Sequence, residues 1–361
     1  MNVVEESSNT PPRGFWTRQL RPTPQERRRM RRRDTWVCVG AAGALLIFAY
    51  LWPPDWRNES PARVWISWAA FMIRVFQLHL GLLVLAVVLL AFFRKQRGPA
   101  LLALPVLVVT LGPAVASWWP RAPVPAAEDP LTIVSCNLLM INRQTRAMGE
   151  QLRAADPDVI FFQEYTDAWH AALQAQLGDR YPHIAYVPRE DSFGAAVYSR
   201  RPFVGRPTKY LPLADAQVPQ IRAVIHVNGR DIALYNLHLR PPWGGRAYVV
   251  QHRREFADLL DRLAAEQLPA VGGGDFNFNE TTPCAAALTA SGFHDAQDEG
   301  GSGRGATWPE LGLLRFAPGI RLDHLYLSPD IHCTRLRTLP SCGSDHRALD
   351  AQISVATSAL R

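Results

Sequence analysis

The sequence predicts a mixed α/β domain that is carried on an N-terminal membrane region. Three charge-poor apolar runs lie within the first 120 residues, and strand-like and helix-like segments alternate from Leu131 to the end of the chain. The 361 residues, 48% of them hydrophobic, suffice for a full core and for more than one domain. Because only 20% of the residues are charged, wholesale disorder is excluded.

The net charge of +7 is unevenly distributed along the chain. Residues 1–127 hold 16 Lys and Arg against 6 Asp and Glu, a balance of +10, whereas the remainder holds 23 against 26, a balance of −3. The basicity therefore belongs to the N-terminal third. A slightly acidic remainder makes nucleic acid a less favoured partner than the total charge suggests.

The N-terminal third is predicted to contain a basic tail and about three transmembrane helices. Residues 1–35 form the tail, with nine Arg and no Lys, and residues 36–119 form the membrane region. Its apolar runs cover 36–52, 78–93 and 99–119, of which the middle one could begin near Trp65. Trp residues at the ends of the runs are typical of a membrane interface. Residues 120–130 contain four Pro and predict a semi-extended linker.

The flanking charges predict the orientation of these helices. Arg-rich residues 13–33 precede the first run, and Arg94, Lys95 and Arg97 separate the second from the third. The positive-inside rule places both segments in the cytoplasm of a bacterial-type cell, so three spans deliver the C-terminal domain to the outer side. The basic segment loosely resembles a twin-arginine export signal, but no small-residue cleavage site follows it. The lipid bilayer is therefore the expected partner of the N-terminal third.

The C-terminal domain, residues 131–361, is predicted to contain mixed sheets covered by helices. Asn228-Gly229 joins two strand-like segments and is a strong hairpin signal, which argues against a purely parallel array. The expected strands are 131–136, 158–162, 194–199, 221–227, 231–238, 269–273, 321–327 and 348–353, and the expected helices are 143–154, 167–177, about 246–266, and a short one that begins at Pro283.

Polar residues gather where these strands end. The six clusters are Asn137, Gln163-Glu164, Asn236 with His238, Asp275 with Asn277 and Asn279, Asp323-His324, and Ser344-Asp345-His346. One such cluster would be an ordinary turn, but six indicate a shared site at one edge of the sheets. The carboxylate and amide oxygens are hard donors without a Cys cluster, which favours Mg²⁺ or Mn²⁺ over zinc. A divalent cation beside a carboxylate base and two His suits phosphate-ester cleavage.

Six motifs occur in a fixed order along residues 131–355: Asn137, QE164, NLH238, GDFN at 274–277, LDH at 322–324 and SDH at 344–346. In this order they resemble the endonuclease/exonuclease/phosphatase superfamily. That superfamily includes DNase I, abasic-site endonucleases, sphingomyelinases and inositol-polyphosphate phosphatases. The resemblance implies a four-layer αββα sandwich. Together with the tail, spans and linker, it is similar to a membrane-anchored bacterial subgroup of VanJ-type teicoplanin-resistance proteins.

The resemblance also implies a role for each matching residue. Glu164 would be the principal metal ligand, with Asn137 and Asp345 close to the metal. His346, paired with Asp323, would bind the phosphoryl group. The remaining residues would act as follows: Asp275 orients or deprotonates the attacking water, Asn277 places the water and the phosphate, and His238 contacts a phosphoryl oxygen or assists the leaving group. Either Asp275 or His346 could be the general base.

Some of the polar residues could have a purely structural role. Asn137 could cap a turn, and alternation along its strand predicts a structural role for His324. Asn236 and Asn279 are expected to support the site without touching substrate. Outside the six clusters, Arg222 and Arg240 could reach phosphate, residues 300–305 are expected to form a mobile loop, and Cys333 and Cys342 could form a disulfide on an oxidising side.

Three functions follow from these expectations. The first is a membrane-anchored, metal-dependent phosphoesterase that acts at the outer face on phosphorylated lipids or small phosphoesters. The second is an extracytoplasmic nuclease, which would normally offer a basic track for the phosphate backbone. The third is a catalytically silent envelope adaptor.

Overall fold

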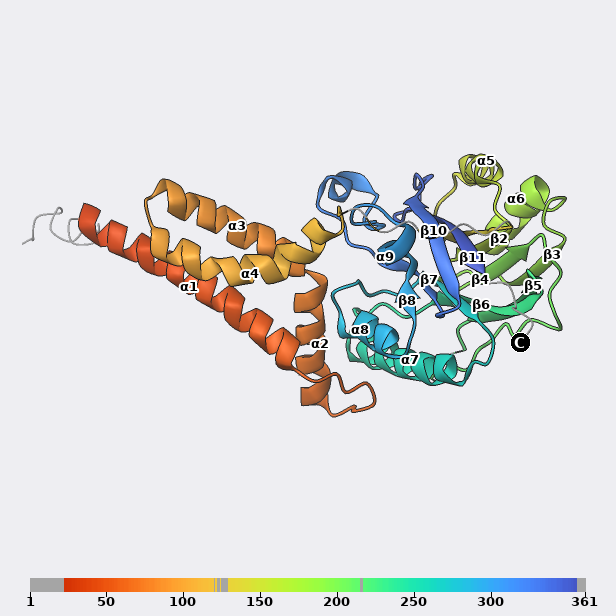
Figure 1. Ribbon diagram of the computed structural model, residues 1–361, viewed down its shortest axis with the longest axis horizontal. Helices are drawn as coiled ribbons and strands as arrows, with labels where there is room; N and C mark the ends of the chain where they lie inside the picture. The colour runs from red at the N-terminus through yellow and green to blue at the C-terminus, as the bar shows by residue number, and fades with distance from the viewer. Residues whose placement is uncertain (1–22, 120, 122–123, 125–128, 215–216, 356–361) are drawn as a thin grey trace, which may run out of the picture.

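The computed structural model describes residues 23–119, 121, 124, 129–214 and 217–355. Figure 1 shows an elongated molecule in which a helical arm projects from a compact α/β domain. Most of the predicted tail and most of the predicted linker lie outside the described residues.

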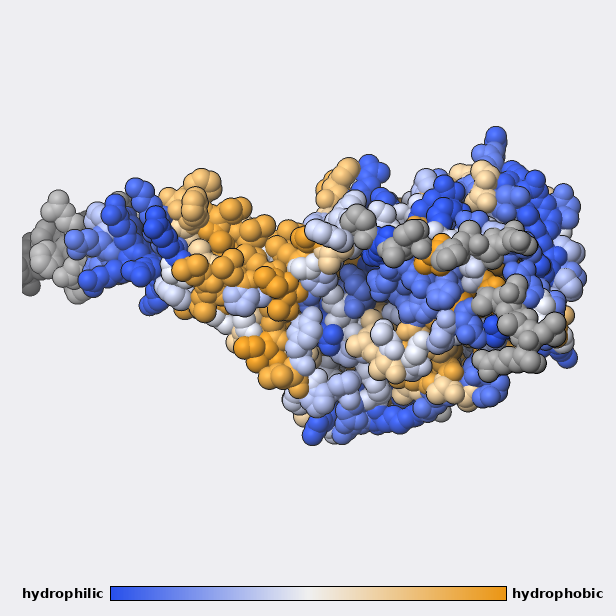
Figure 2. All heavy atoms as spheres, viewed as in Figure 1, coloured by the Kyte–Doolittle hydropathy of each residue, from blue (hydrophilic) through white to orange (hydrophobic). Residues whose placement is uncertain are grey.

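The arm consists of helices α1 (Pro24–Leu51), α2 (Pro61–Val75), α3 (Gln77–Phe93) and α4 (Arg97–Ala116). Of these, α1 and α4 are long and apolar enough to cross a membrane, and α2 with α3 would be a third span if that pair is one broken span. The pair is bent by 63° at Phe76. The surface of α3, α4 and the later turns of α1 is largely apolar, whereas the Arg-rich start of α1 is hydrophilic (Figure 2).

Helix α1 begins twelve residues before the predicted apolar run. Thr23 and Glu26 form a capping box, in which the Thr23 hydroxyl accepts from the Glu26 amide and Glu26 accepts from the Thr23 amide. This cap starts the helix at Pro24, so Arg27 to Arg33 lie on its first turns. The prediction placed these arginines in a tail without regular structure. The helix starts earlier than predicted because the capping box, and not an apolar period, sets its beginning.

The C-terminal domain contains two sheets that pack face to face. The first has the strand order β10-β11-β1-β2-β4-β3 and the second the order β5-β6-β7-β9-β8. The bounds are β1 Leu131–Asn137, β2 Val159–Gln163, β3 His183–Val187, β4 Ala195–Ser199, β5 Ile221–Val227, β6 Arg230–His238, β7 Ala270–Asp275, β8 His294–Asp295, β9 Asp323–Leu327, β10 Ile331–Thr338 and β11 Leu349–Val355.

Helices cover the outer face of each sheet. Helices α5 (Thr145–Ala155) and α6 (Asp167–Leu177) pack on the first sheet, while α7 (Arg246–Ala265) and α8 (Pro283–Ala290) pack on the second. Apolar side chains of both sheets, among them Phe161 and Leu325, form the core between them. The four-layer αββα sandwich is therefore confirmed. Two short elements, α9 (Ala296–Gly300) and the 3₁₀ helix η1 (Gly312–Phe316), lie in loops.

Three strands were not predicted, namely β3, β8 and β10. All three lie at sheet edges, where a strand has a neighbouring strand on one side only and so needs fewer apolar residues. In β10, Ile331, Cys333 and Leu336 are buried in the core, but a bulge between Cys333 and Arg335 breaks their alternation. Arg335 and Arg337 pair with Asp350 of β11. The five cysteines, including Cys333 and Cys342, are free thiols.

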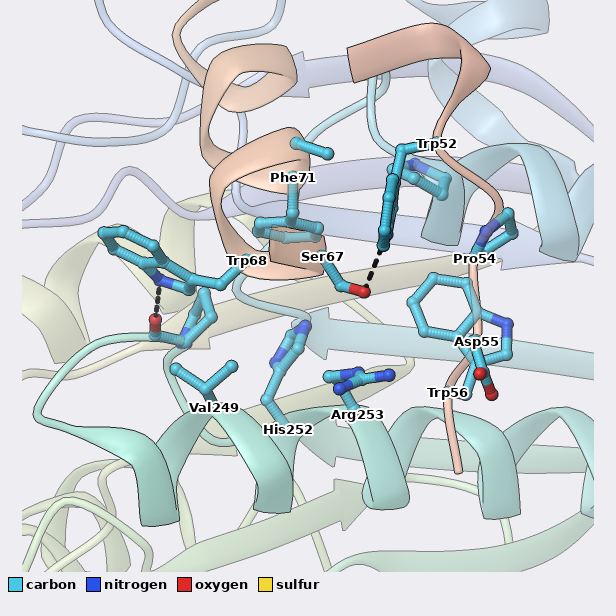
Figure 3. Close-up of a pocket in the computed structure, with 13 residues that line it drawn as sticks. Trp52, Pro54, Asp55, Trp56, Ser67, Trp68, Phe71, Val249, His252 and Arg253 are labelled. Carbon is cyan, nitrogen blue, oxygen red and sulfur yellow. Dashed lines mark hydrogen bonds between the residues drawn. The ribbon is translucent and has the colours of Figure 1, made fainter. Parts of the chain in front are cut away.

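Helix α2 fastens the arm to the domain. Its Trp68 indole donates to the Pro242 carbonyl at 2.7 Å, and its Phe71 ring packs edge-on against His252 of α7 (Figure 3). The Asn279 amide donates to the Val75 carbonyl at 2.9 Å. The pocket between these elements has a volume of only about 30 Å³, so the two parts are tightly packed.

A buried ion pair fixes the edge of the second sheet. Arg321 and His324 each place a nitrogen 2.8 Å from the Asp295 carboxylate, and the same carboxylate caps α9 by accepting from the Gln297 amide at 2.9 Å. The other ring nitrogen of His324 lies 3.0 Å from the Phe278 carbonyl. Burial alone raises the pKa of Asp295, but Arg321 and His324 outweigh it and hold that pKa below its ordinary range. The structural role predicted for His324 matches these contacts.

We expect Asp295→Asn to lower the free energy of unfolding by about 3 kcal/mol at pH 7, because it leaves the buried Arg321 unpaired. A group whose pKa is lowered by folding stabilises the fold above its unfolded-state pKa, about 3.9 for Asp, and loses that effect as the pH falls further. Thermal unfolding in detergent from pH 8 to pH 3 measures the difference. Asp179→Asn, at an exposed position, is the control, and equal stability of the two variants at pH 7 would contradict the assignment.

Candidate active site

Strand pairing brings the predicted residues to one edge of the two sheets. The parallel pair β1–β2 aligns Asn137 with Gln163, so Glu164 follows at the same edge. In the second sheet, Asp275 of β7 aligns with His238 of β6 and with Asp323 of β9. The Asn137 amide joins the two groups, since its nitrogen lies 3.3 Å from Glu164 Oε1 and 3.2 Å from Asp275 Oδ2.

Two of these residues have an unusual backbone conformation. Glu164 and Asn277 have φ values of 56° and 52°, in the left-handed region that non-glycine residues rarely adopt. Such a conformation costs on the order of 1 kcal/mol or more and is typical of functional sites. Around Glu164 the Met140 amide donates to Oε2 at 2.9 Å. The Asn277 amide donates to Asp275 Oδ1 at 2.9 Å, which orients that carboxylate.

His346 and Asp323 form a buried pair. His346 Nδ1 lies 2.7 Å from Asp323 Oδ2, and His346 Nε2 lies 3.7 Å from Asp275 Oδ2. Burial lowers the pKa of His346, but Asp323 and Asp275 outweigh it and raise the pKa to about 10. Ser344 holds the loop in place, because its hydroxyl accepts from the His346 amide and donates to the Asn137 carbonyl. His346 is therefore an oriented cation.

Asp275 lies between two imidazoles of opposite character. His238 Nε2 is 3.6 Å from Asp275 Oδ2, on the same carboxylate oxygen that faces His346. Burial and the neighbouring His346 lower the pKa of His238 to about 4, so this ring is neutral at pH 7. Burial raises the pKa of Asp275 to about 7. A carboxylate with that pKa suits proton transfer near neutral pH.

The donor set fits a divalent cation. Asp275 and Asp323 each bring a carboxylate oxygen within 4.8 Å of the other, and Glu164 reaches the same Asn137 amide as Asp275. His346 lies within the same distance of both carboxylates, but as an imidazolium it offers no lone pair to a metal. Within the described part of the chain, Asp345 Oδ1 and Asp323 Oδ1 are buried without a hydrogen-bond partner. Burial also raises the pKa of Glu164. Buried carboxylate oxygens that lack partners are costly, and a cation would relieve that cost. The assignment of Glu164, Asn137 and Asp345 as ligands stays a prediction.

These groups line a cleft of about 280 Å³ with an aromatic rim. The rim contains Phe193, Trp243, Tyr248 and Trp308, none of which was singled out from sequence. The Trp308 indole donates to Asp345 Oδ2 at 3.2 Å, so it also orients that carboxylate. These aromatics carry no motif signal because they come from three separate parts of the chain: Phe193 precedes β4, Trp243 and Tyr248 lie just before and in the first turn of α7, and Trp308 precedes η1.

The structure separates the residues that reach the cleft from those that support it. Glu164, His238, Asp275, Asn277, Asp345 and His346 line the cleft. Asn137 and Asp323 are buried behind these residues. The Asn277 side-chain amide donates to the Leu239 carbonyl, which leaves its oxygen available.

The flanking polar residues fall into two groups. Asn236 donates to the Phe162 and Ala196 carbonyls and so ties the second sheet to the first. Arg222 pairs with Glu266 and is thereby committed to a structural ion pair. Arg240 also pairs with a carboxylate, because its Nε lies 3.4 Å from Glu255 Oε1, and its guanidinium lies over the rings of Phe193 and Tyr248 at the rim. It is thus a cation at the edge of the cleft.

A second group of possible metal ligands lies outside the cleft. His294 of β8, Glu299 of α9 and His332 of β10 place their ligand atoms within 4.8 Å of one another. This group bridges the edges of the two sheets and takes no part in the cleft.

Comparison with known proteins agrees with this architecture. The sequence profile of the Endonuclease/Exonuclease/phosphatase family matches residues 134–346. No curated protein matches the chain. Among solved structures, D. rerio TDP2 complexed with a single strand DNA product is 18% identical, with a TM-score of 0.51, covering 63% of this chain and 100% of that one. The mannosyl-6-phosphatase Bt3783 of Bacteroides thetaiotaomicron is 18% identical, with a TM-score of 0.50, covering 62% and 99%.

A family protein from Beutenbergia cavernae is 19% identical, with a TM-score of 0.50, covering 64% of this chain and 73% of that one. These structures share the fold, and the profile spans every motif from the end of β1 to His346. The chain belongs to the Endonuclease/Exonuclease/phosphatase family, whose members are hydrolases of phosphoester bonds.

Proposed function

We propose that this protein is a membrane-anchored, divalent-metal-dependent phosphoesterase that hydrolyses phosphorylated lipids or small phosphoesters at the outer face of the membrane. The observation that carries the proposal is the convergence, in one cleft, of buried carboxylates, a neutral imidazole and an imidazolium. Phosphoryl transfer needs positive charge around the equatorial oxygens of the phosphoryl group, which the imidazolium supplies. It also needs a base beside the attacking water, which a carboxylate supplies.

The geometry supports a division of labour among the residues. Asp275 is placed to accept a proton from water, because Asn277 orients its carboxylate and its pKa lies near 7. His346, kept protonated by Asp323, is placed to stabilise charge on a phosphoryl oxygen. His238 faces the same carboxylate as a neutral ring, which suits contact with the leaving group. A bound divalent cation would supply further charge neutralisation of the phosphoryl group.

The cleft is coupled to the arm, which favours substrates that reside in a membrane. Pro242, whose carbonyl accepts from Trp68 of α2, adjoins Trp243 of the cleft rim. The His252 ring packs against Phe71 of α2. Its Nδ1 lies 2.6 Å from the carbonyl of Arg240. One wall of the cleft is thus fastened to the helix that leads into α3. The resemblance to VanJ-type proteins points to the same class of substrate in the cell envelope.

The nuclease hypothesis is supported by the aromatic rim, since unpaired bases stack on such rings. Against it stands the charge balance of −3 after residue 127. The adaptor hypothesis requires an inactive cleft, and the complete set of carboxylates and histidines argues against that.

We expect His346→Ala and Asp275→Ala each to lower turnover by several orders of magnitude, because one removes the oriented cation and the other the base. The assay uses the detergent-purified full chain with Mg²⁺ or Mn²⁺ and compares phospholipids, undecaprenyl pyrophosphate, plasmid DNA and RNA in parallel. His226→Ala, at an exposed position on β5, is the control. Selective nicking of DNA would overturn the lipid preference, and a parent activity equal to that of Glu164→Ala would support the adaptor.

We expect Glu164→Gln to weaken Mn²⁺ binding by about tenfold or more, because it removes a charged oxygen ligand. Isothermal titration calorimetry or Mn²⁺ electron paramagnetic resonance measures the affinity without any substrate. Glu190→Gln, at an exposed position, is the matched control. Unchanged affinity in Glu164→Gln would remove Glu164 from the ligand set.

We expect alkaline phosphatase fused after residue 130 to be active, and the same enzyme fused after Lys95 to be inactive, because the positive-inside rule keeps the α3–α4 loop in the cytoplasm. Activity on whole cells measures the orientation. The reverse pattern would place the cleft in the cytoplasm and reopen the nucleic-acid hypothesis.

A further inference from the structure

A strongly apolar surface loop follows one wall of the cleft. This apolar loop, residues 309–318, contains η1, and the side chains of Leu313, Leu314 and Phe316 are 85%, 60% and 74% exposed. Exposed large apolar groups that adjoin one another mark an interaction surface, whereas scattered ones are ordinary. Nothing in the described part of the domain covers these three side chains.

The apolar loop is tied to the cleft at its start. Trp308, which lines the cleft, precedes it, and the Glu310 amide donates to the Asp345 carbonyl at 2.8 Å. Its far end is tied to the arm, because the carbonyl of Pro318 lies 2.8 Å from Nε2 of His79 in the first turn of α3. The apolar loop therefore bridges the active site and a membrane helix.

The neighbouring ends of the helices indicate where the apolar loop lies relative to the expected membrane interface. Trp118 and Trp119 follow the end of α4 and are 71% and 75% exposed, as is typical of side chains at a membrane interface. The Gly303 amide donates to the Ser117 carbonyl at 3.1 Å, so the domain surface meets α4 at the same level. In Figure 1 the blue segment that follows α9 lies on the side of the domain that faces the helical arm.

We propose that the apolar loop inserts into the leaflet on the domain's side of the membrane and positions the cleft over phosphorylated headgroups of lipids in that leaflet. The proposal rests on the phosphoesterase function above and names its substrate class. Leu313, Leu314 and Phe316 supply the inserting surface, whereas Arg315, whose guanidinium lies 4.8 Å from the Phe316 ring centre, can extend to lipid phosphates. A lipid leaflet is the expected occupant because the surface continues from the interfacial ends of α3 and α4.

Insertion is tested directly with a fluorescent label. Leu313→Cys, made in a chain with Cys38→Ser and Cys342→Ser, is labelled with a nitrobenzoxadiazole dye and reconstituted at full length into phosphatidylcholine and phosphatidylglycerol vesicles. We expect lipids with brominated acyl chains to quench the dye at position 313. Val204→Cys, beside β5 at the end of the domain away from the arm, should stay unquenched (Figure 1). If brominated lipids do not quench the dye at position 313, the proposal is overturned. This holds also if the dye is shielded because a second copy of the protein covers the apolar loop.

The substrate class is tested with a pair of lipids that share one headgroup. For Leu313→Asp with Phe316→Asp we expect kcat/KM to fall about tenfold or more on dioleoyl phosphatidic acid in vesicles, because insertion is lost. On water-soluble dibutyryl phosphatidic acid we expect less than about a twofold change, because the cleft is intact. Undecaprenyl and dimethylallyl pyrophosphate form a second pair, and Val204→Asp is the control.

An equal loss on both members of a pair would give the apolar loop a structural role and overturn the proposal. If the parent hydrolyses neither member of either pair, the phosphoesterase function fails on these substrates. The quenching experiment still decides whether the loop inserts.

Discussion

The contact between Asn137 and Asp275 is the constraint on which the rest of the site depends. Asn137 ends a strand of the first sheet and Asp275 ends a strand of the second, and the amide of one lies 3.2 Å from the carboxylate of the other. Glu164 lies beside the first residue and His346 beside the second. Because both residues are buried at strand ends, the packing of the sheets sets the geometry of the cleft directly.

This arrangement concentrates negative charge where the solvent is excluded. Glu164 and Asp275 both have raised pKa values because burial disfavours their charged forms. The strained backbone at Glu164 and Asn277 adds a further cost. Buried carboxylate oxygens without partners and strained backbone are stable only when the surrounding fold holds them, and four packed layers provide that support. A bound divalent cation, as proposed above, would relieve part of this cost.

The helical arm also holds two segments that form the rim of the cleft. Helix α2 turns away from α3 by 63° and packs on α7 of the domain, and its Trp68 contacts the loop that carries part of the cleft rim. A second segment of the rim continues from Trp308 through the apolar loop to the His79 contact on α3. Both segments of the rim are therefore anchored in the helical arm.

Sequence reasoning identified mixed sheets covered by helices, the apolar helices and every carboxylate and histidine that lines the cleft, because apolar periods and strand-end polar motifs are local signals. The αββα layering followed from the family resemblance. It missed the edge strands β3, β8 and β10: β8 has only two residues, and a bulge breaks the apolar alternation of β10. It also missed the Arg-rich start of α1, the aromatic rim and the docking of α2. The rim and the docking join residues far apart in the chain. Only the tertiary structure decides them, because their partners are selected by packing in three dimensions and leave no periodic mark in the sequence.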